Sequence, residues 1–191
     1  MRRPARVLAL HAIATFLIVS TAQAQPFRLT SPDVKPNGRI AEEQVFNGFG
    51  CSGKNISPAL RWSGAPPGTK SFALLVHDPD APTGGAGWWH WLVIDIPADV
   101  TALKKDAGKA DGANLPSEAT RQIGTDFGTP GWGGPCPPAG AKAHHYHFTL
   151  YALKVEKLDV PNDARASLVG FMVNANSIAK ATLTGVYGRA K

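Results

Sequence analysis

The sequence predicts a mainly β fold, in which two antiparallel sheets pack as a sandwich and one helix lies near the C-terminus. The 191 residues include 20 glycines and 16 prolines but only 18% charged residues, a composition that disfavours coiled coils and long helical bundles. Short apolar runs alternate with these turn formers, and one segment alone has helical spacing. The hydrophobic fraction of 43% disfavours a disordered chain.

The first 24 residues have the three parts of a secretory signal peptide. Three arginines in residues 2–6 give a positive start, residues 7–19 are mostly apolar, and residues 22–24 read Ala-Gln-Ala. The alternative, a membrane anchor, is disfavoured because a spanning helix needs roughly 20 apolar residues. We therefore expect one mature domain over residues 25–191, periplasmic or secreted, with no transmembrane segment.

The charge of the mature domain gives little reason to expect a nucleic-acid partner. Removing the three arginines lowers the formal net charge from +6 to +3. Lys104, Lys105 and Lys109 form the nearest approach to a basic cluster, but Asp106 interrupts it and no aromatic side chain stands between them to stack bases. A solvated loop is the simpler interpretation.

Four segments have the composition and the boundaries of strands. The first stops at Asp78-Pro79, the second ends at Pro97, and the third is rich in tyrosine, phenylalanine and leucine. The four predicted strands are Ser71–Val76, Trp88–Ile96, His144–Val155 and Thr182–Tyr187. Residues 106–134, rich in glycine and proline, form a long excursion of the kind that is often functional.

The predicted helix lies between the last two of these strands. An apolar stripe at spacings of three and four, expected to face the core, consists of Leu168, Phe171, Met172, Ala175 and Ile178. Pro161 marks a start, and Asn162 or Asp163 would cap the helix.

Two motifs at strand ends carry side chains that could bind a ligand or take part in catalysis. Residues 78–82 read Asp-Pro-Asp-Ala-Pro. The two prolines can fix the position of a carboxylate that binds a ligand. Alternatively, the segment is only a turn in which the aspartates cap backbone N–H groups. Residues 88–91 read Trp-Trp-His-Trp. Strand alternation would place Trp89 and Trp91 on one face and Trp88 and His90 on the other. His90 is then either a satisfied, half-buried histidine or part of an aromatic-walled site.

Two further motifs are open to more than one interpretation. In residues 144–147, His-His-Tyr-His, alternation places His144 and Tyr146 together on one face. Two histidines at i, i+2 can share a metal, but no further ligands stand at metal spacing nearby, so we expect no metal. Residues 131–138, Gly-Trp-Gly-Gly-Pro-Cys-Pro-Pro, form a stiff loop that a ligand could approach closely. The sequence has no phosphate-binding loop, dinucleotide fingerprint or nucleophile elbow.

In this order, the segments resemble the phosphatidylethanolamine-binding protein family, also called the Raf-kinase-inhibitor-like family, and within it the bacterial YbhB/YbcL subgroup. The matching stretches are VFNGFGCSGKNISPALRW (45–62), GTKSFALLVHDPDAPTGGAGWWHWLVIDIP (68–97), TDFGTPGWGGPCPP (125–138), HHYHFTLYAL (144–153) and LVGFMVNANSIAKATLTGVY (168–187). The resemblance implies the family's two-sheet fold, with a small anion-binding pocket at one end of it.

The resemblance also implies which residues form that pocket. The pocket residues would be Asp78, Pro82, His90, Pro137, Pro138, His144 and Tyr146. Supporting places fall to Asp80, Trp89 and Cys136. The arginine usual between the family's paired histidine and tyrosine is replaced by His145.

This set of groups favours binding of a small anion or zwitterion. Two imidazoles, a phenol and backbone N–H groups can donate to phosphate oxygens, and Asp78 can keep a histidine protonated or accept from an ammonium. We expect phosphate or a phosphoethanolamine-like head group as ligand, bound more tightly as pH falls through the histidine range, and no cofactor. In an oxidising compartment, Cys51 and Cys136 are expected to form a disulfide rather than remain two buried thiols.

Three functions are compatible with these expectations. The preferred one is a non-enzymatic binding protein that holds a small anion or head group and inhibits or modulates a protein partner. The second is an acid–base hydrolase for a small phosphoester or ester, disfavoured because no activated nucleophile or metal site is evident. The third is an interaction protein that acts on a protease or a host protein. The bacterial subgroup also suggests a homodimer.

Overall fold

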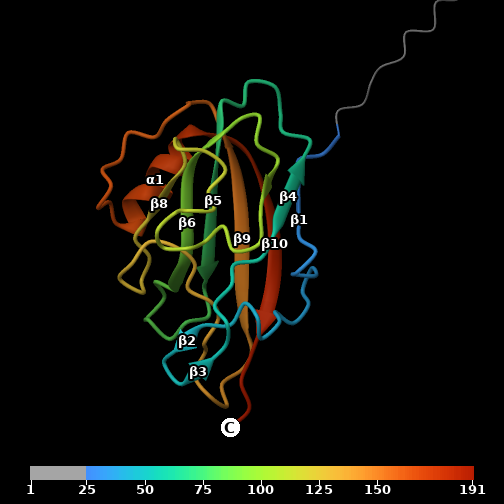
Figure 1. Ribbon diagram of the computed structural model, residues 1–191, viewed down its shortest axis with the longest axis vertical. Helices are drawn as coiled ribbons and strands as arrows, with labels where there is room; N and C mark the ends of the chain where they lie inside the picture. Colours follow the sequence, from blue (N-terminus) through green and yellow to red (C-terminus); the bar gives the residue numbers. More distant parts are fainter. Residues whose placement is uncertain (1–24) are drawn as a thin grey trace, which may run out of the picture.

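The structure, a computed structural model, describes residues 25–191, so the expected signal peptide at residues 1–24 lies outside the described part. The elements in chain order are β1 (Arg28–Thr30), β2 (Asn47–Gly48), β3 (Cys51–Ser52), β4 (Leu60–Ser63), β5 (Ser71–Asp78), β6 (Trp88–Pro97), β7 (Ala102–Leu103), β8 (Arg121–Ile123), β9 (His144–Leu153), α1 (Ala166–Asn176) and β10 (Ser177–Tyr187). The prediction of a mainly β fold with antiparallel sheets and one C-terminal helix is confirmed (Figure 1).

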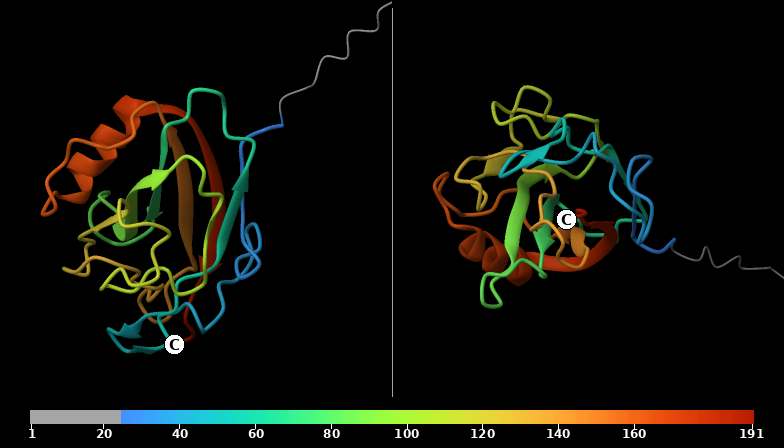
Figure 2. Two further views of the ribbon diagram at one scale, coloured as in Figure 1. Left: turned by 45° about the horizontal axis from the view of Figure 1, so that its top comes forward. Right: turned by 90° about the horizontal axis from the view of Figure 1, so that it is seen from below.

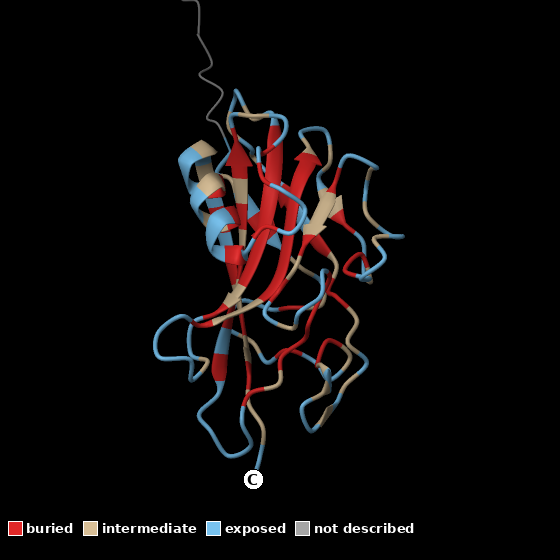
Figure 3. Cartoon of the chain, turned by 90° about the vertical axis from the view of Figure 1, so that its left-hand side faces the viewer, coloured by how far each residue is buried: buried red, intermediate tan, exposed pale blue. Residues whose placement is uncertain are grey.

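A five-stranded antiparallel sheet in the order β10-β9-β5-β6-β8 forms the centre of the molecule. Its middle strand, β5, pairs with β6 on one side and β9 on the other, and Ser71 to Val76 are all buried. A strand buried on both faces has a continuous apolar run instead of alternation, which explains the composition of this segment. Figure 3 shows the buried strands at the centre.

The two faces of the central sheet are covered by different layers (Figure 2). On one face lies the three-stranded sheet β1-β4-β7, whose Trp62 packs edge-on against Phe72 at 5.5 Å between ring centroids. On the other face, Val169 and Val173 of α1 share a core cluster with Leu75. The predicted sandwich thus accounts for the two packed sheets, and the helix adds a third layer on the other face of the central sheet.

The predicted buried face of the helix is wrong except at Met172, which is partly buried against the same core cluster. Its buried residues are Ala166, Val169 and Val173, which form their own stripe at spacings of three and four. Phe171 is 69% exposed and Leu168 is 42% exposed. The helix thus packs its stripe of small and β-branched side chains against the sheet, in place of the neighbouring stripe with larger side chains.

The predicted start of the helix is wrong as well. The N-cap is Arg165, and no side chain caps the free N–H groups. Asn162 is engaged elsewhere, because its Oδ1 accepts a hydrogen bond from Nη1 of Arg121 at 3.0 Å. Ile178, expected on the helix, belongs to β10. No helix in residues 25–191 is long and apolar enough to cross a membrane.

Candidate ligand-binding cavity

A cavity of about 280 Å³ opens where β5, β6 and β9 meet the loops around residues 127 and 136. It is lined by Phe49, Asp78, Ala81, Pro82, Thr83, Trp88, His90, Phe127, Cys136, Pro137, Pro138, His144 and Tyr146. Every predicted pocket residue is therefore in one place. The sequence did not identify Phe49 and Phe127 as cavity residues, because they lie outside the polar motifs. Their position next to glycine-rich stretches was the one feature that could have suggested a place near a ligand.

The aspartates at the end of β5 have two distinct roles. Asp78 is buried; its Oδ1 accepts a hydrogen bond from the backbone N–H of Asp80 at 2.8 Å, and its Oδ2 lies 2.7 Å from Nδ1 of His144. Asp78 thus both caps the turn and orients a cavity histidine, so the two interpretations of this motif hold together. Asp80 does not line the cavity. Its Oδ2 accepts from the backbone N–H and the Nδ1 of His145, which joins the loop to β9.

A β-bulge in β6 places His90 in the cavity. Trp89 pairs with His77 and Trp91 pairs with Val76, so His90 is the extra residue between them. The predicted alternation is wrong after this point, because the bulge turns Trp91 to the same face as His90, where it shares a core cluster with Trp132 and Tyr146. Trp89 packs on the opposite face, 4.2 Å from the ring of His77, and does not line the cavity. Trp88 lines it instead.

His90 is held as a neutral imidazole of defined tautomer. Its Nδ1 lies 2.5 Å from the carbonyl oxygen of Gly133, and because a carbonyl only accepts, Nδ1 must carry the proton. Burial lowers the pKa of His90 to about 4, against the opposing effects of the Gly133 hydrogen bond and the Asp78 charge. At neutral pH the Nε2 of His90 is therefore a lone-pair acceptor, whereas the sequence suggested that both cavity imidazoles could donate to an anion.

Two buried polar atoms of the cavity have no hydrogen-bond partner. Within the described residues, four buried side-chain atoms lack one: Gln44 Oε1, Trp62 Nε1, His90 Nε2 and Tyr146 Oη. Burial, and next the charge of Asp78, raise the pKa of Tyr146 far above the physiological range, so its hydroxyl remains a donor. The rings of His90 and Tyr146 stand edge to face at 5.0 Å. Since buried polar groups are nearly always paired, these two atoms mark a place for a polar ligand.

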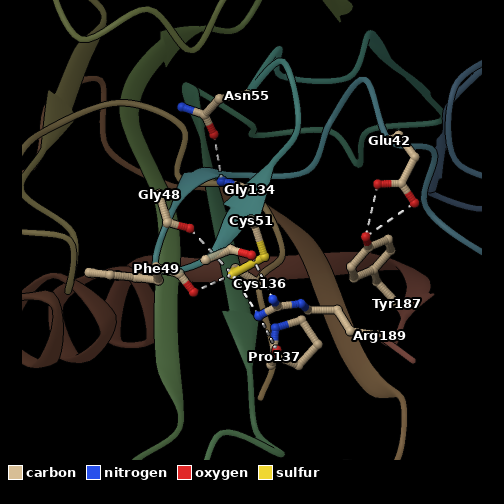
Figure 4. The surroundings of a disulfide bond; sticks show 11 residues. Glu42, Gly48, Phe49, Cys51, Asn55, Gly134, Cys136, Pro137, Tyr187 and Arg189 are labelled. Atoms are coloured by element: carbon tan, nitrogen blue, oxygen red, sulfur yellow. Dashed lines mark hydrogen bonds between the residues drawn. A yellow bond between two sulfur atoms is a disulfide. The ribbon is translucent and has the colours of Figure 1, made fainter. Parts of the chain in front are cut away.

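The wall of the cavity is tied to the rest of the fold by a disulfide. Cys51 and Cys136 are joined at 2.06 Å, which confirms the predicted pair (Figure 4). Arg189 donates to the carbonyl oxygens of Pro137 at 3.2 Å and Gly50 at 2.6 Å, so three distant segments meet here. A Cβ at Gly133 would lie 2.3 Å from the ring of Phe127, which explains why glycine is needed beside the histidine.

Aromatic rings form the outer side of the cavity. Phe127 packs against Phe46 at 4.5 Å, Phe49 at 5.9 Å and Trp88 at 5.6 Å between centroids. Phe49 is nevertheless 69% exposed, so one edge of this cluster faces solvent. The polar groups thus lie at the base of the cavity and an apolar rim lies above them.

A second groove and a pair of stacked histidines offer fewer unpaired polar groups to a ligand. A groove of about 640 Å³ runs between residues 124–130 and the start of α1, but none of the unpaired buried atoms lines it. His145 and His147 stack at 6.4 Å, and their Nδ1 atoms bond to Asp80 and Thr184. No cluster of three or more potential metal ligands occurs in the part of the chain that the structure describes.

The antiparallel core, the Asp-His-Tyr base and the disulfide-tied wall define a class of small-ligand-binding protein. The family model "Phosphatidylethanolamine-binding protein" matches residues 30–188, and the chain belongs to this family. Its relatives include the UPF0098 protein YbcL of Escherichia coli, 54% identical over 170 residues, which cover 89% of this chain and 92% of YbcL. The UPF0098 protein YbhB of the same organism is 42% identical over 84% of this chain and 99% of YbhB. The crystal structure of YbcL superimposes with a TM-score of 0.82 and covers 85% of this chain and 98% of that one.

Proposed function

We propose that the chain is a non-enzymatic binding protein that holds a small phosphate-like group, free or as part of a head group, in the cavity of Asp78, His90, His144 and Tyr146. The observation that carries the proposal is the pair of unpartnered buried atoms, His90 Nε2 and Tyr146 Oη, at the base of the cavity. A ligand with several oxygens would supply the hydrogen bonds that these atoms lack.

The shape and polarity of the cavity support the same conclusion. A volume of about 280 Å³ suits a small head group, and the aromatic rim of Phe49, Phe127 and Trp88 suits an apolar substituent attached to it. Asp78 also gives an ammonium group a partner, so a phosphoethanolamine-like zwitterion remains compatible with the site.

Direct titration tests this proposal. Inorganic phosphate and phosphoethanolamine are titrated into the wild-type chain by calorimetry, with Tyr146→Phe as the variant that removes one donor. We expect saturable one-to-one binding, weakened by about tenfold to a hundredfold in the variant, because a hydrogen bond to a charged group contributes about 1.5–3 kcal/mol. If neither ligand gives a saturable binding heat with the wild type, the proposal is refuted.

A hydrolase is the second candidate, favoured by one observation. The carboxylate of Asp78 orients His144 at 2.7 Å, an arrangement that can support general base catalysis. Against it, Cys136 is in the disulfide, the hydroxyl of Thr83 donates to the carbonyl oxygen of Gly87 at 3.0 Å, and Tyr146 stays protonated. A panel of phosphoesters and esters, with His144→Ala as control, separates the two: turnover lost in the variant would favour the hydrolase.

We further propose that the chain is exported and acts on a protein partner through this cavity. The three-part pattern of residues 1–24 and the Cys51–Cys136 disulfide support an oxidising location. N-terminal sequencing of protein recovered from the periplasm or medium is expected to begin at Gln25. Affinity capture from the same compartment, with and without excess phosphate, tests for a partner, and sedimentation tests for the suggested homodimer.

A further inference from the structure

We propose that the cavity selects monoanionic oxyanions that carry a P–OH group, so that it binds dihydrogen phosphate or a singly protonated phosphate monoester and rejects sulfate. The inference rests on the proposed function and narrows its ligand class. It follows from the direction in which each polar group at the base of the cavity can make a hydrogen bond.

The acceptor side of this recognition is His90. The carbonyl oxygen of Gly133 fixes the proton of the ring on Nδ1, and the bulge that brings His90 into the cavity leaves Nε2 buried with a free lone pair. A lone pair facing an unprotonated oxyanion oxygen is repelled by it, whereas a P–OH group donates to it. The hydroxyl of Tyr146, which stands edge to face with His90, provides the complementary donor for an unprotonated oxygen of the same ligand.

The charge of the cavity acts in the same direction. The carboxylate of Asp78 is buried at its base, and none of the described residues that line the cavity is lysine or arginine. The guanidinium of Arg189, beside the disulfide-tied wall, donates to the backbone oxygens of Pro137 and Gly50. A dianion beside a buried carboxylate, with no lysine or arginine in the cavity to offset the second charge, is costly, so the monoanion is preferred.

Several titratable groups surround His90, and the test has to separate the effect of their titration on affinity from the effect of the ligand's own titration. They are Asp78 and His77 on β5, His144 and Tyr146 on β9, and Asp126 in the loop after β8. Sulfate does not change its own protonation in the range of the test, so the pH dependence of its affinity reports the titration of these groups. A fall in phosphate affinity that sulfate does not share reports the change in the ligand, and dimethyl phosphate then separates the P–OH group from the charge.

The experiment is calorimetry of the wild-type chain with inorganic phosphate and with sulfate between about pH 5.5 and pH 8. Over this range phosphate changes from the monoanion, which has two P–OH groups, to the dianion, which keeps one, whereas sulfate is an unprotonated dianion throughout. We expect sulfate to bind at least about tenfold more weakly than phosphate at the acid end, the difference that corresponds to about 1.4 kcal/mol. The phosphate-to-sulfate ratio is expected to fall as pH rises.

Methyl phosphate and dimethyl phosphate separate the proton from the charge. A phosphate monoester has a second pKa of about 6, so its protonated fraction, and with it the apparent affinity, falls about fiftyfold between pH 6 and pH 8. Dimethyl phosphate is a permanent monoanion without a P–OH group. We expect it to bind more weakly than methyl phosphate at pH 6 and to follow the pH dependence of sulfate.

Two variants connect the selectivity to His90. His90→Gln can present either an amide donor or an acceptor at the place of Nε2, so its phosphate-to-sulfate ratio is expected to approach one. Tyr146→Phe removes a donor that both anions use, so it should weaken both and leave the ratio unchanged. Its unchanged ratio also shows that the cavity is still folded.

The outcomes distinguish this inference from the function on which it rests. Equal, saturable binding of phosphate and sulfate would overturn the selectivity and leave the binding function standing. Failure of both anions, methyl phosphate and phosphoethanolamine to bind would overturn the proposed function itself. A selectivity that persists in His90→Gln would show that His90 is not its source.

Discussion

At the scale of single residues, the behaviour of the cavity depends on which groups are kept neutral. His90 and Tyr146 are both buried, and burial opposes the charged form of each: the imidazolium of one and the phenolate of the other. Asp78 accepts two hydrogen bonds, one from the backbone N–H of Asp80 and one from Nδ1 of His144. The base of the cavity is therefore a set of directional hydrogen-bonding groups rather than a cluster of positive charge.

The low pKa of His90 predicts a loss of stability in acid. The unfolded chain binds a proton at His90 below about pH 6.5, while the folded chain does so only below a pKa of about 4. The unfolded state thus holds more protons in this window, and the free energy of unfolding falls as pH drops from 6.5 to 4. The wild type should lose about 3 kcal/mol more than His90→Asn, which has no titrating ring but can still donate to Gly133.

Urea denaturation of both proteins at several pH values measures this difference. Protonation of the carboxylates destabilises both proteins, so only the gap between them reports His90. A gap that stays constant from pH 7 to pH 4 would contradict the pKa assigned to His90.

At the scale of elements, the strands could be predicted from the sequence, but their local irregularities could not. The starts of β5, β6 and β9 match the predicted strands because turn formers bound each apolar run. The bulge at His90 has no mark in composition, since it arises from the pairing register of β5 and β6. The buried face of α1 was ambiguous because two apolar stripes lie side by side on it, and the packing against the sheet chose the one with smaller side chains.

The segment that leads into α1 is held by a buried carboxylate on β6. Asp95 is 3% exposed; its Oδ1 accepts from the backbone N–H of Leu158 at 2.8 Å, and its Oδ2 accepts from Nε of Arg121 at 2.7 Å. Arg121 also donates to the backbone oxygens of Leu158 and Val160. We expect Asp95→Ala to lower the free energy of unfolding by about 3–5 kcal/mol, because it leaves Arg121 without its carboxylate and the N–H of Leu158 without an acceptor.

Chemical denaturation measures this loss, with Asp99→Ala as a control at an exposed aspartate just beyond the same strand. Asp95 does not line the cavity, so phosphate affinity at a temperature where the variant is folded should be close to that of the wild type. A loss below about 1 kcal/mol would mean that the pair adds little beyond its desolvation cost.

At the scale of the whole molecule, the polar groups and the prolines of the cavity were predictable and its phenylalanine rim was not. Asp78, His90, His144 and Tyr146 stand in short motifs whose chemistry is visible in the sequence. Phe49 and Phe127 are about 80 positions apart and meet only because the β2–β3 hairpin packs over the loop after β8. Nothing local in the chain signals such a contact, so the rim emerges only with the tertiary fold.

The disulfide is the covalent link that holds this rim, and its loss should affect stability and binding together. It joins positions 85 residues apart, for which the chain-entropy model gives a stabilisation of about 4.5 kcal/mol. We expect the double variant Cys51→Ser/Cys136→Ser to lose up to about that amount in urea denaturation. Phosphate affinity should fall as well, because Pro137 and Pro138 line the cavity directly after Cys136 and would have to be ordered on binding.

Reduction of the wild type provides a matched comparison, since it breaks the same bond without changing the two side chains to serine. The reduced wild type and the double variant should have similar unfolding midpoints, both below that of the oxidised protein. Thiol titration of unfolded, unreduced protein should find no free cysteine, and two free thiols would contradict the bond itself. If the bond forms but its loss changes stability by less than about 1 kcal/mol, the remaining ties of the wall, above all the hydrogen bonds of Arg189 to Pro137 and Gly50, already hold this end of the molecule together.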